Sequence, residues 1–350
     1  MELFNLIDYA IENRASDIHF TVGVPPILRI DGALNYFNEE KLNSEDIKKI
    51  VREILDREQF NELESKGEID TSYSRPGVSR FRVNIYKQRG SYAIALRIIP
   101  FRIPTMQELG LPKVAEDLSR LPRGLILVTG PTGSGKSTTL ASMINLINEE
   151  RNCHILTLED PIEYLHKHNR SMVNQREIGT DSNSFANALR AALRQDPDVI
   201  LVGEMRDLET ISIALTAAET GHLVLSTLHT VGAAKTIDRV VDVFPPYQQQ
   251  QIRVQLASVL QAIISQQLLP KSNDKGRIAV FETMVATPAI RNLIREEKIH
   301  QIDTVIQTSR KQGMKTMDQA LIELFQNGLI SKEIVLSQAA SQDIVKKYVF

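Results

Sequence analysis

The sequence predicts an α/β protein with more than one domain, centred on a parallel sheet that helices cover on both faces. From about residue 110 to about residue 285, short and nearly continuous apolar runs alternate with helical stretches, which is the pattern of strands buried on both faces. The chain has 350 residues, of which 42% are hydrophobic, so it can build two or three packed cores.

The charge balance argues against a protein whose main partner is nucleic acid. Such domains are usually strongly basic, whereas 41 Lys and Arg against 43 Asp and Glu give this chain a net charge of −2.

The single cysteine, Cys153, excludes an internal disulfide and a zinc site built on cysteines. Residues 1–14 match an amphipathic helix and not a signal peptide, and no 18 apolar residues run together. We therefore expect a cytoplasmic chain that does not span a membrane.

Residues 1–100 predict a smaller α+β domain. Helical spacing of apolar residues marks two helices, and short apolar or alternating runs mark strands that end in a hairpin around Gln88-Arg89-Gly90. The helices are expected at 3–11 and 44–60, and the strands at 16–21, 27–30, 80–86 and 92–99. Two prolines, Pro100 and Pro104, then mark a linker, which we place at 101–108.

The core of the α/β region is expected at 109–285. Its strands are the apolar runs at 125–128, 155–158, 199–202 and 223–228. Crossover helices join parallel strands, and the stretches between these runs are helical in pattern. Beyond about residue 285 the strand pattern stops, so 286–350 is expected to form a helical C-terminal region that contains the helix start Thr287-Pro288.

The strongest local signal is a phosphate-binding loop. Residues 130–137, GPTGSGKS, match the pattern G-x-x-x-x-G-K-[ST]. This pattern is meaningful between a strand and a helix, and here the apolar run 125–128 precedes it and a helical stripe follows it. The stripe consists of Leu140, Met143, Ile144 and Ile147. The sequence therefore predicts a loop that binds a nucleotide.

Each residue type in this loop has a chemical reason. Glycines let successive N–H groups turn toward phosphate oxygens, and the helix that follows adds the positive end of its dipole. Lys136 places its charge on the β- and γ-phosphates, and the Ser137 hydroxyl is a ligand for Mg²⁺. The expected cofactors are thus ATP and Mg²⁺. The loop residues predicted to hold them are Gly130, Thr132, Gly133, Ser134, Gly135, Lys136, Ser137 and Thr138.

Hydrolysis also needs carboxylates, and two apolar runs lead into them. Glu163 follows the run at 155–158, and Glu204 follows the run at 199–202. In a parallel sheet the ligand lies at the carboxyl ends of the strands, so both acids are expected to face the loop. One of them can support Mg²⁺ through its water shell, and the other can orient or deprotonate the attacking water. Glu204 is the predicted metal ligand beside Ser137.

A histidine follows the next run in the same way. The run at 223–228 ends at His229, which is therefore expected at the same edge of the sheet, while His222 precedes the run. At that edge His229 can sense the γ-phosphate. The alternative is an ordinary histidine that is hydrogen-bonded to the backbone.

A basic stretch without acids lies in the first domain. No Asp or Glu occurs between Asp70 and Glu108. The same stretch carries seven cations, namely Arg75, Arg80, Arg82, Lys87, Arg89, Arg97 and Arg102. Without counter-ions, these side chains would form an electropositive face. Three interpretations remain open: a solvated strand face, a site for nucleic-acid phosphates, or arginine fingers that reach the ATP of a neighbouring subunit in a ring.

With these residues, the chain resembles the superfamily of type II and type IV secretion ATPases, and within it the PilT-like group of pilus retraction ATPases. The likeness runs over nearly the whole length. The segments that carry it are SDIH at 16–19, PILRIDG at 26–32, the phosphate loop, LEDPIE at 158–163, RQDPDVILVGEMRD at 194–207 and TGHLVLSTLHT at 220–230. Together they form a highly specific set.

Two features favour the retraction group. Residues 289–296, AIRNLIRE, are similar to an element that is typical of retraction ATPases. By itself this segment predicts a short amphipathic helix with Ile290, Leu293 and Ile294 buried, and the resemblance adds a functional surface. Extension and type II secretion ATPases usually carry a four-cysteine zinc site and further N-terminal domains. This chain has one cysteine and about 100 residues before its core.

The resemblance implies a homo-hexameric ring that acts as a motor. Each subunit would have a PAS-like N-terminal domain and a RecA-like P-loop core, with ATP between them and arginines of the N-terminal domain reaching it. Arg80, Arg82 and Arg97 are the candidates by position. Glu204 corresponds to the Walker B acid and Glu163 to the Asp-box glutamate, and either of them can polarise the water. His222 and His229 correspond to the His box.

The function that this resemblance implies is retraction of a type IV pilus, and with it twitching motility, through an inner-membrane platform protein. The expected location is the cytoplasmic face of the inner membrane. A pilus extension or type II secretion motor on the same core is the first alternative. A hexameric nucleic-acid translocase and a nucleotide-gated scaffold without turnover are the others.

Overall fold

The structure is a computed structural model, and it describes residues 3–13, 15–30, 32–75, 78–99, 102–272 and 276–349. The chain divides into two compact units. The first comprises Met1–Arg102 with Glu163–Leu165, and the second comprises Ile103–Ile162 with His166–Phe350. Pro100 and Phe101 of the expected linker region lie outside the described residues, and so does Asp31 of the segment 26–32.

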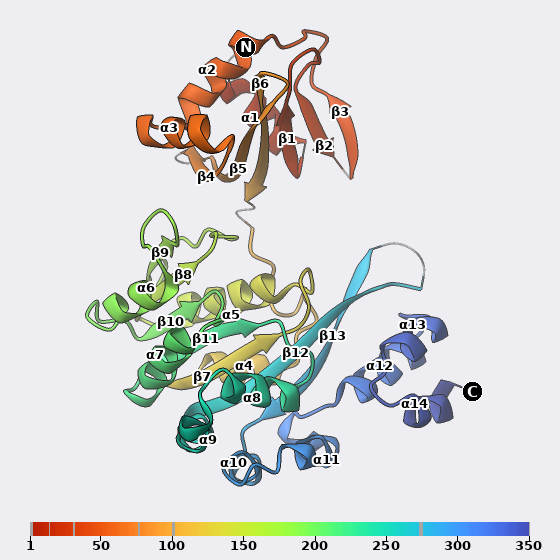
Figure 1. Cartoon of the computed structure of the whole chain (residues 1–350). Coiled ribbons are helices and arrows are strands. Elements are labelled where there is room, and N and C mark those ends of the chain that lie inside the picture. The colour runs from red at the N-terminus through yellow and green to blue at the C-terminus, as the bar shows by residue number, and fades with distance from the viewer. Residues whose placement is uncertain are drawn as a thin grey trace. The chain divides into compact units, whose positions relative to one another are not determined.

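The first unit is a six-stranded antiparallel sheet with three helices (Figure 1). The strand order is β3-β2-β1-β6-β5-β4. The elements are α1 Leu3–Glu12, β1 Asp17–Phe20, β2 Ile27–Ile30, β3 Ala33–Tyr36, α2 Ser44–Ile54, α3 Arg57–Lys66, β4 Glu68–Arg75, β5 Ser79–Gln88 and β6 Ser91–Ile99. The expected hairpin at 80–99 is present as β5 and β6, whereas β3 and β4 were not expected.

Alternation of side chains separates the two faces of this sheet. In β5, the buried residues Phe81, Val83 and Ile85 alternate with Arg80 and Arg82. The buried face packs against the apolar sides of α1 and α2 in one hydrophobic cluster. The arginines therefore lie on the opposite, polar face.

The single helix expected at 44–60 is two helices. The Asp56 carboxylate accepts a hydrogen bond from the Gln59 amide at 2.9 Å, and the Gln59 side chain accepts one from the Asp56 amide at 3.2 Å. This reciprocal capping box starts α3 and separates it from α2. The apolar stripe in the sequence continues across the break, which is why its period did not reveal the boundary.

The second unit is built on a seven-stranded sheet with the order β13-β12-β7-β11-β10-β8-β9. All neighbouring strands are parallel except β12 and β13, which are antiparallel. The elements are α4 Val114–Ser119, β7 Gly124–Thr129, α5 Lys136–Glu150, β8 His154–Glu159, β9 Met172–Glu177, α6 Phe185–Ala192, β10 Val199–Val202, α7 Leu208–Glu219, β11 Leu223–Leu228, α8 Ala233–Asp242, α9 Pro246–Val259, β12 Leu260–Pro270 and β13 Arg277–Val285. The four predicted strands are present, and β9, β12 and β13 are additional.

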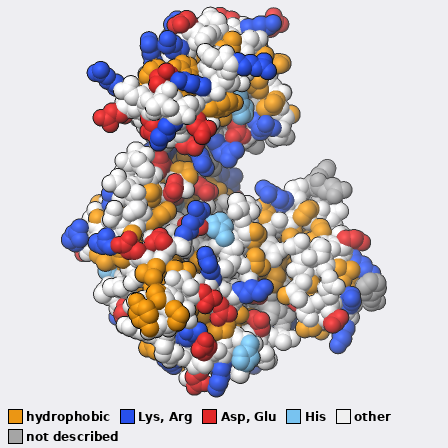
Figure 2. All heavy atoms as spheres, in the orientation of Figure 1, with side chains coloured by type: hydrophobic (Ala, Val, Ile, Leu, Met, Phe, Trp, Pro, Cys, Tyr) orange, Lys and Arg blue, Asp and Glu red, His pale blue; other side chains and the backbone are white. Residues whose placement is uncertain are grey.

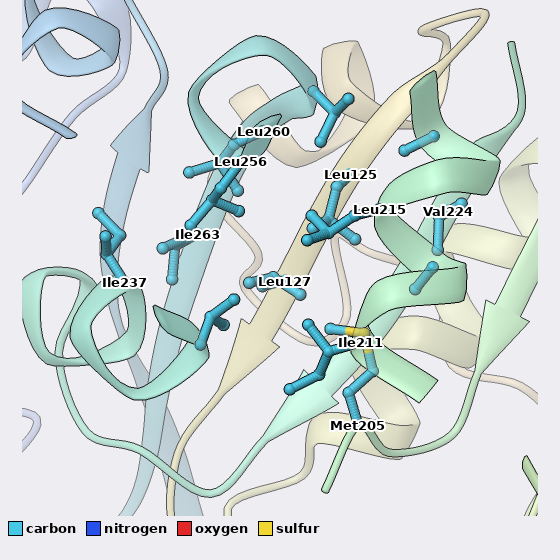
Figure 3. Close-up of a cluster of buried hydrophobic side chains, with 14 of the residues drawn as sticks. Leu125, Leu127, Met205, Ile211, Leu215, Val224, Ile237, Leu256, Leu260 and Ile263 are labelled. Carbon is cyan, nitrogen blue, oxygen red and sulfur yellow. The ribbon is translucent and has the colours of Figure 1, made fainter. Parts of the chain in front are cut away.

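Helices cover both faces of this sheet, as the continuous apolar runs predict. Leu125 and Leu127 of β7 point to the side of α7, α8 and α9, where they join a large buried cluster (Figure 3). Ile126 and Val128 of the same strand point to the other side and pack with α4 and α5. A strand that is buried on both faces shows no alternation, and β7 is buried at every position.

The C-terminal region is helical, as expected from the sequence. Its elements are α10 Pro288–Arg295, α11 Ile302–Thr308, α12 Met317–Gln326, α13 Lys332–Gln338 and α14 Gln342–Val349, with short 3₁₀ turns at Ile299–Gln301 and Arg310–Gln312. Ile290 and Ile294 of α10 are buried and Leu293 is half-buried, which confirms the amphipathic helix predicted at 289–296. Arg291 donates hydrogen bonds to the carbonyl oxygens of Ala257 and Ser258 at 2.5 and 2.9 Å, and so caps the end of α9.

A buried carboxylate joins this C-terminal region to the sheet. Glu282 of β13 accepts a hydrogen bond from the Ala233 amide at 2.7 Å and one from the Met317 amide at 3.1 Å. These amides are the first residues of α8 and α12, so one carboxylate satisfies the start of two helices. Burial raises the pKa of Glu282, and the nearby acids Asp303 and Asp318 raise it further, although the two amide hydrogen bonds lower it.

We expect Glu282→Ala to lower the free energy of unfolding by about 2–5 kcal/mol, because two buried N–H groups lose their acceptor. The raised pKa also makes wild-type stability fall as the pH rises from the ordinary value of 4.5 through the raised value, since the folded state binds this proton more tightly. In the alanine variant, the free energy of unfolding should lack this decrease with pH. Urea unfolding at several pH values measures both effects.

Glu323→Ala is the matched control. This α12 carboxylate is partly exposed and pairs with Lys315 at 2.5 Å, so its loss should cost less than about 1 kcal/mol. An unchanged free energy of unfolding in Glu282→Ala would show that Glu282 does not join these two helices.

Candidate active site

The phosphate loop lies between the end of β7 and the start of α5, as predicted. Gly130 has a φ of 143°, and a Cβ at this position would lie 2.1 Å from the backbone oxygen of Gln266. No larger residue fits there without a shift of the neighbouring strand. Gly135 precedes α5 with a φ of 88°, in the left-handed region that glycine enters without strain.

Lys136 is held within this loop. Its ammonium donates hydrogen bonds to the carbonyl oxygens of Gly130 and Pro131 at 2.9 and 3.1 Å, and the residue is only 9% exposed. A buried ammonium needs such partners to keep its charge. The side chain is therefore fixed beside the loop amides that the sequence assigns to phosphate oxygens.

Glu204 and His229 meet at the carboxyl ends of β10 and β11. The Nε2 atom of His229 lies 3.0 Å from Oε1 of Glu204, and its Nδ1 atom lies 3.5 Å from Nζ of Lys136 and 3.4 Å from Oγ1 of Thr132. Since an ammonium only donates, Nδ1 is the acceptor and Nε2 carries the proton that faces the carboxylate. His229 thus connects the phosphate loop to the acid after β10.

A second cation also contacts Glu204. Nε of Arg206 donates to Oε1 of this carboxylate at 2.5 Å. Burial raises the pKa of Glu204, but the hydrogen bond from Arg206 and the proximity of His229 outweigh it, so that the pKa lies below its ordinary value. The carboxylate is ionised at neutral pH and is a weak base, which suits it to orienting a water or a hydrated cation.

Hydrogen bonds between the ends of the two strands fix the backbone around this acid. Oγ1 of Thr227 donates to the carbonyl oxygen of Gly203 at 2.6 Å, and Oγ of Ser226 donates to that of Val202 at 2.7 Å. The amide of Met205 also donates to Thr227. Glu204 therefore leaves the sheet in a defined direction.

The residues expected to bind Mg²⁺ suit a hard cation by their chemistry. Ser137 lies in the first turn of α5, and its hydroxyl has no hydrogen-bond partner among the described residues. Glu204 supplies an ionised carboxylate. Within the described ranges, no cluster of three His, Cys, Asp or Glu side chains has the arrangement of a metal site. In nucleotide sites Mg²⁺ is usually held by one or two protein oxygens together with phosphates and water.

Two predicted site residues are not brought to the loop by the second unit. His222 precedes β11 and lies at its amino end, whereas His229 and the loop lie at the carboxyl end; its Nδ1 atom is 2.9 Å from the Ala217 carbonyl oxygen. Glu163 is exposed, and its contacts assign it to the first unit. The residue before it, Ile162, belongs to the second unit, where its amide donates a hydrogen bond to the Glu177 carboxylate at 3.1 Å. A role for Glu163 at the nucleotide stays a prediction.

The three candidate arginines share the polar face of the first sheet. The strand register places Arg82 opposite Arg97, and Arg97 opposite Asp17. Nε of Arg97 donates to Asp17 at 3.0 Å, while Arg80 donates to the hydroxyls of Ser72 and Ser74 at 2.7 and 3.1 Å. Arg82 is exposed. Of the three, Arg82 is the side chain best placed to meet a ligand.

The expectation of seven cations without counter-ions is wrong for at least three of them. Arg97 pairs with Asp17, Arg75 pairs with Asp8 at 2.6 Å, and Lys87 pairs with Glu64 at 3.1 Å. These acids come from β1, α1 and α3, far away in the sequence. The basic stretch is therefore less electropositive than its composition indicates.

Sequence reasoning missed two residues of this site. Arg206 lies two positions beyond Glu204, within the segment 194–207 that carries the resemblance, and its place in the sequence does not indicate that it contacts Glu204. Gln266 of β12 lies against the loop, with its amide nitrogen 2.6 Å from the carbonyl oxygen of Ser134. In the sequence Gln266 is only a polar residue after an apolar run, and nothing near it indicates a contact with the phosphate loop.

The chain is similar to known proteins over nearly its whole length. A model of the family described as "Type II/IV secretion system protein" matches residues 2–336. The type IV pilus retraction ATPase PilT of Pseudomonas aeruginosa is 50% identical over 333 residues, which are 95% of this chain and 96% of that protein. A twitching motility protein of Neisseria gonorrhoeae is 49% identical over 94% of this chain and 90% of its own length.

A solved structure is similar in the same way. The crystal structure of the pilus retraction motor PilT with bound ADP superposes with a TM-score of 0.91, at 50% identity and with 99% of each chain covered. These findings agree with the two sheets and the phosphate loop described above, and they confirm the fold class predicted from the sequence. The chain therefore belongs to the family of type II/IV secretion system proteins.

Proposed function

We propose that this chain is a P-loop ATPase that hydrolyses ATP to power retraction of a type IV pilus, and with it twitching motility. The observation that carries the proposal is the line of contacts from the Lys136 ammonium through His229 to Glu204, at the edge of the sheet where a nucleotide binds. Its similarity to PilT over almost the full length supports the same function and confirms the retraction-type ATPase that the sequence predicts.

In this mechanism the chain contributes binding, charge and orientation. The loop amides and the start of α5 hold the phosphates, and Lys136 neutralises part of their charge. Ser137 and Glu204 would hold Mg²⁺ with its water shell, and bound Mg²⁺ would supply further positive charge at the phosphates. Glu204 or Glu163 orients the attacking water. His229 links the loop to Glu204, so that a change at the γ-phosphate alters the hydrogen bond that Glu204 receives.

We assign Arg80, Arg82 and Arg97 to the charge that develops during phosphate transfer, within a homo-hexameric ring. Both Arg82 and Arg97 are exposed, but the Arg97 guanidinium is paired with Asp17. We therefore expect Arg82→Ala to lower turnover at least tenfold and to change ATP affinity much less, as measured by kcat and by equilibrium binding. Arg89→Ala, at the turn after β5, is the control. Equal losses of turnover and affinity in Arg82→Ala would contradict this assignment.

The expected location is the cytoplasmic face of the inner membrane, through contact with a platform protein of the pilus machinery. No helix in the described part of the chain has the length and apolar character needed to cross a bilayer. The α10 surface is a candidate for contacts within that machinery. Arg291 is not available for such contacts because it caps α9, which leaves the exposed positions of the helix.

A deletion strain tests the retraction function directly. Cells that lack this protein should carry more surface pili and should not twitch, and the wild-type gene should restore motility, whereas Lys136→Ala should not. A strain that loses its surface pili would instead identify an extension or secretion motor. In parallel, the purified protein should hydrolyse ATP; tight ATP binding with negligible turnover would identify a scaffold.

A nucleic-acid translocase is the least supported alternative. On the face shown in Figure 2, Lys and Arg side chains are interspersed with Asp and Glu side chains. Three cations of the basic stretch are also neutralised by ion pairs. Stimulation of ATP hydrolysis by single-stranded DNA, with a steep loss at higher salt, would favour this alternative.

A further inference from the structure

Gln266 lies inside the second unit, directly beside the phosphate loop. It belongs to β12, which pairs with β7 in parallel, and the register places the preceding residue, Ser265, opposite Thr129. Gln266 therefore stands where β7 ends and the loop begins. Only 1% of its surface is exposed, so its polar side chain must find its hydrogen bonds within the protein.

The side-chain amide of Gln266 joins two parts of the nucleotide site. Its Nε2 atom donates to the carbonyl oxygen of Ser134 at 2.6 Å, and its Oε1 atom accepts from Oγ1 of Thr139 at 2.8 Å. A carbonyl oxygen only accepts hydrogen bonds, which fixes the orientation of the amide. The Gln266 side chain thus connects Ser134 of the loop to Thr139 of α5, and these two residues lie on either side of Lys136 in the sequence.

Close contacts of Gln266 with two glycines restrain the loop as well. Its carbonyl oxygen lies so close to Gly130 that only a glycine fits there, and its Nε2 atom would lie 3.2 Å from a Cβ at Gly135. The two glycines at the ends of the loop therefore both face this one residue. A loop rich in glycine has many accessible backbone conformations, and contacts of this kind reduce their number.

We propose that Gln266 is a positioning residue that keeps the phosphate loop in its nucleotide-binding shape. This inference rests on the proposed function, because it assumes that the loop binds a nucleotide. A loop that is already ordered loses less conformational entropy on binding, so that the affinity for the ligand is higher. The position requires an amide. A glutamate cannot donate to the Ser134 oxygen, and a leucine can neither donate to it nor accept from Thr139.

The test is nucleotide binding by full-length variants. In Gln266→Leu both hydrogen bonds are lost, and in Gln266→Glu a carboxylate oxygen faces the Ser134 carbonyl. We expect each variant to raise the Kd for ADP with Mg²⁺ about tenfold, the size of one lost buried hydrogen bond. At saturating ATP the loss of kcat should be smaller than the rise in KM. Once ATP is bound, the phosphate loop of the variant has the same shape as in the wild type and supports the same chemistry.

Thr139 supplies a second and independent pair of variants. Thr139→Val removes the hydroxyl that Gln266 accepts from, whereas Thr139→Ser keeps it. We expect the valine variant to bind ADP more weakly and the serine variant to bind it almost as the wild type does. If Gln266→Leu does not fold, this comparison and Gln266→Glu decide the question.

Two controls separate positioning from general stability. Gln267→Leu changes the next residue of β12, whose side chain points to the opposite face, and should leave the Kd for ADP unchanged. Leu321→Ala, in the buried C-terminal cluster, should lower Tm without a change in Kd. Gln266 variants that lose Tm but bind ADP like the wild type would overturn the inference. A wild-type protein that binds no ADP would remove the proposed function and this inference with it.

Discussion

Lys136→Ala is expected to lower ATP hydrolysis by about 10²–10³-fold, and to weaken ATP binding as well. The Lys136 ammonium is 9% exposed and is held by two loop carbonyl oxygens, so its charge is fixed where the phosphates are expected. Its removal leaves the carbonyl oxygens of Gly130 and Pro131 pointing into the site, where they repel phosphate oxygens. Steady-state hydrolysis and equilibrium binding of labelled ATP measure the two effects.

An arginine should not rescue this variant. The wider guanidinium does not fit between the two carbonyl oxygens that hold the ammonium, so we expect Lys136→Arg to be almost as inactive. Lys113→Ala, at an exposed lysine of the same unit, is the matched control and should leave hydrolysis unchanged. Hydrolysis at the wild-type rate in Lys136→Ala would show that the phosphate loop is not the active site.

Glu204→Gln is expected to lower kcat by about 10²–10⁴-fold and to leave ADP binding close to that of the wild type. The substitution keeps the shape of the side chain but removes the charge that Arg206 and His229 stabilise. A water or hydrated cation at this position then loses a negatively charged acceptor. Because the pKa of Glu204 lies below its ordinary value of 4.5, wild-type turnover should not fall through protonation of this group until the pH is below that value.

Parallel variants show which acid orients the water. Glu209→Gln removes an exposed carboxylate of α7 that pairs with Arg190, and it should have no effect on kcat. Glu163→Gln tests the other candidate. If Glu163→Gln loses more turnover than Glu204→Gln, the water is oriented by Glu163 and Glu204 serves Mg²⁺. A loss of ADP binding in Glu204→Gln that matches its loss of kcat would indicate a structural role for the Glu204 carboxylate.

The sequence by itself determined the elements whose signals are local. The phosphate loop is a continuous segment, and the apolar runs on which it depends are buried on both faces as their composition requires. Glu204 and His229 could be placed at one edge because each lies within two residues of the end of such a run, and the structure brings them within 3.0 Å. The family resemblance rested on the same continuous segments, and the similarity to PilT confirms it.

Boundaries without a local signal were missed. The strand β12 begins at Leu260, directly after α9 ends at Val259, with no turn residue between them. An apolar residue at this position is compatible with both a helix and a strand, so the periodicity of apolar residues does not reveal where α9 ends and β12 begins. The break between α2 and α3 is a different case, because the capping box of Asp56 and Gln59 is a local signal, but the apolar stripe continues across it and predicts one helix.

Only the tertiary structure decided which polar groups meet. Gln266 contacts Ser134 across 132 positions of sequence, Asp17 neutralises Arg97 across 80, and Asp8 neutralises Arg75 across 67. The burial of one polar side chain requires a partner, but many residues of the chain can supply it. The partner is selected by strand order and register, which depend on the packing of the whole unit and not on the residues near it in sequence.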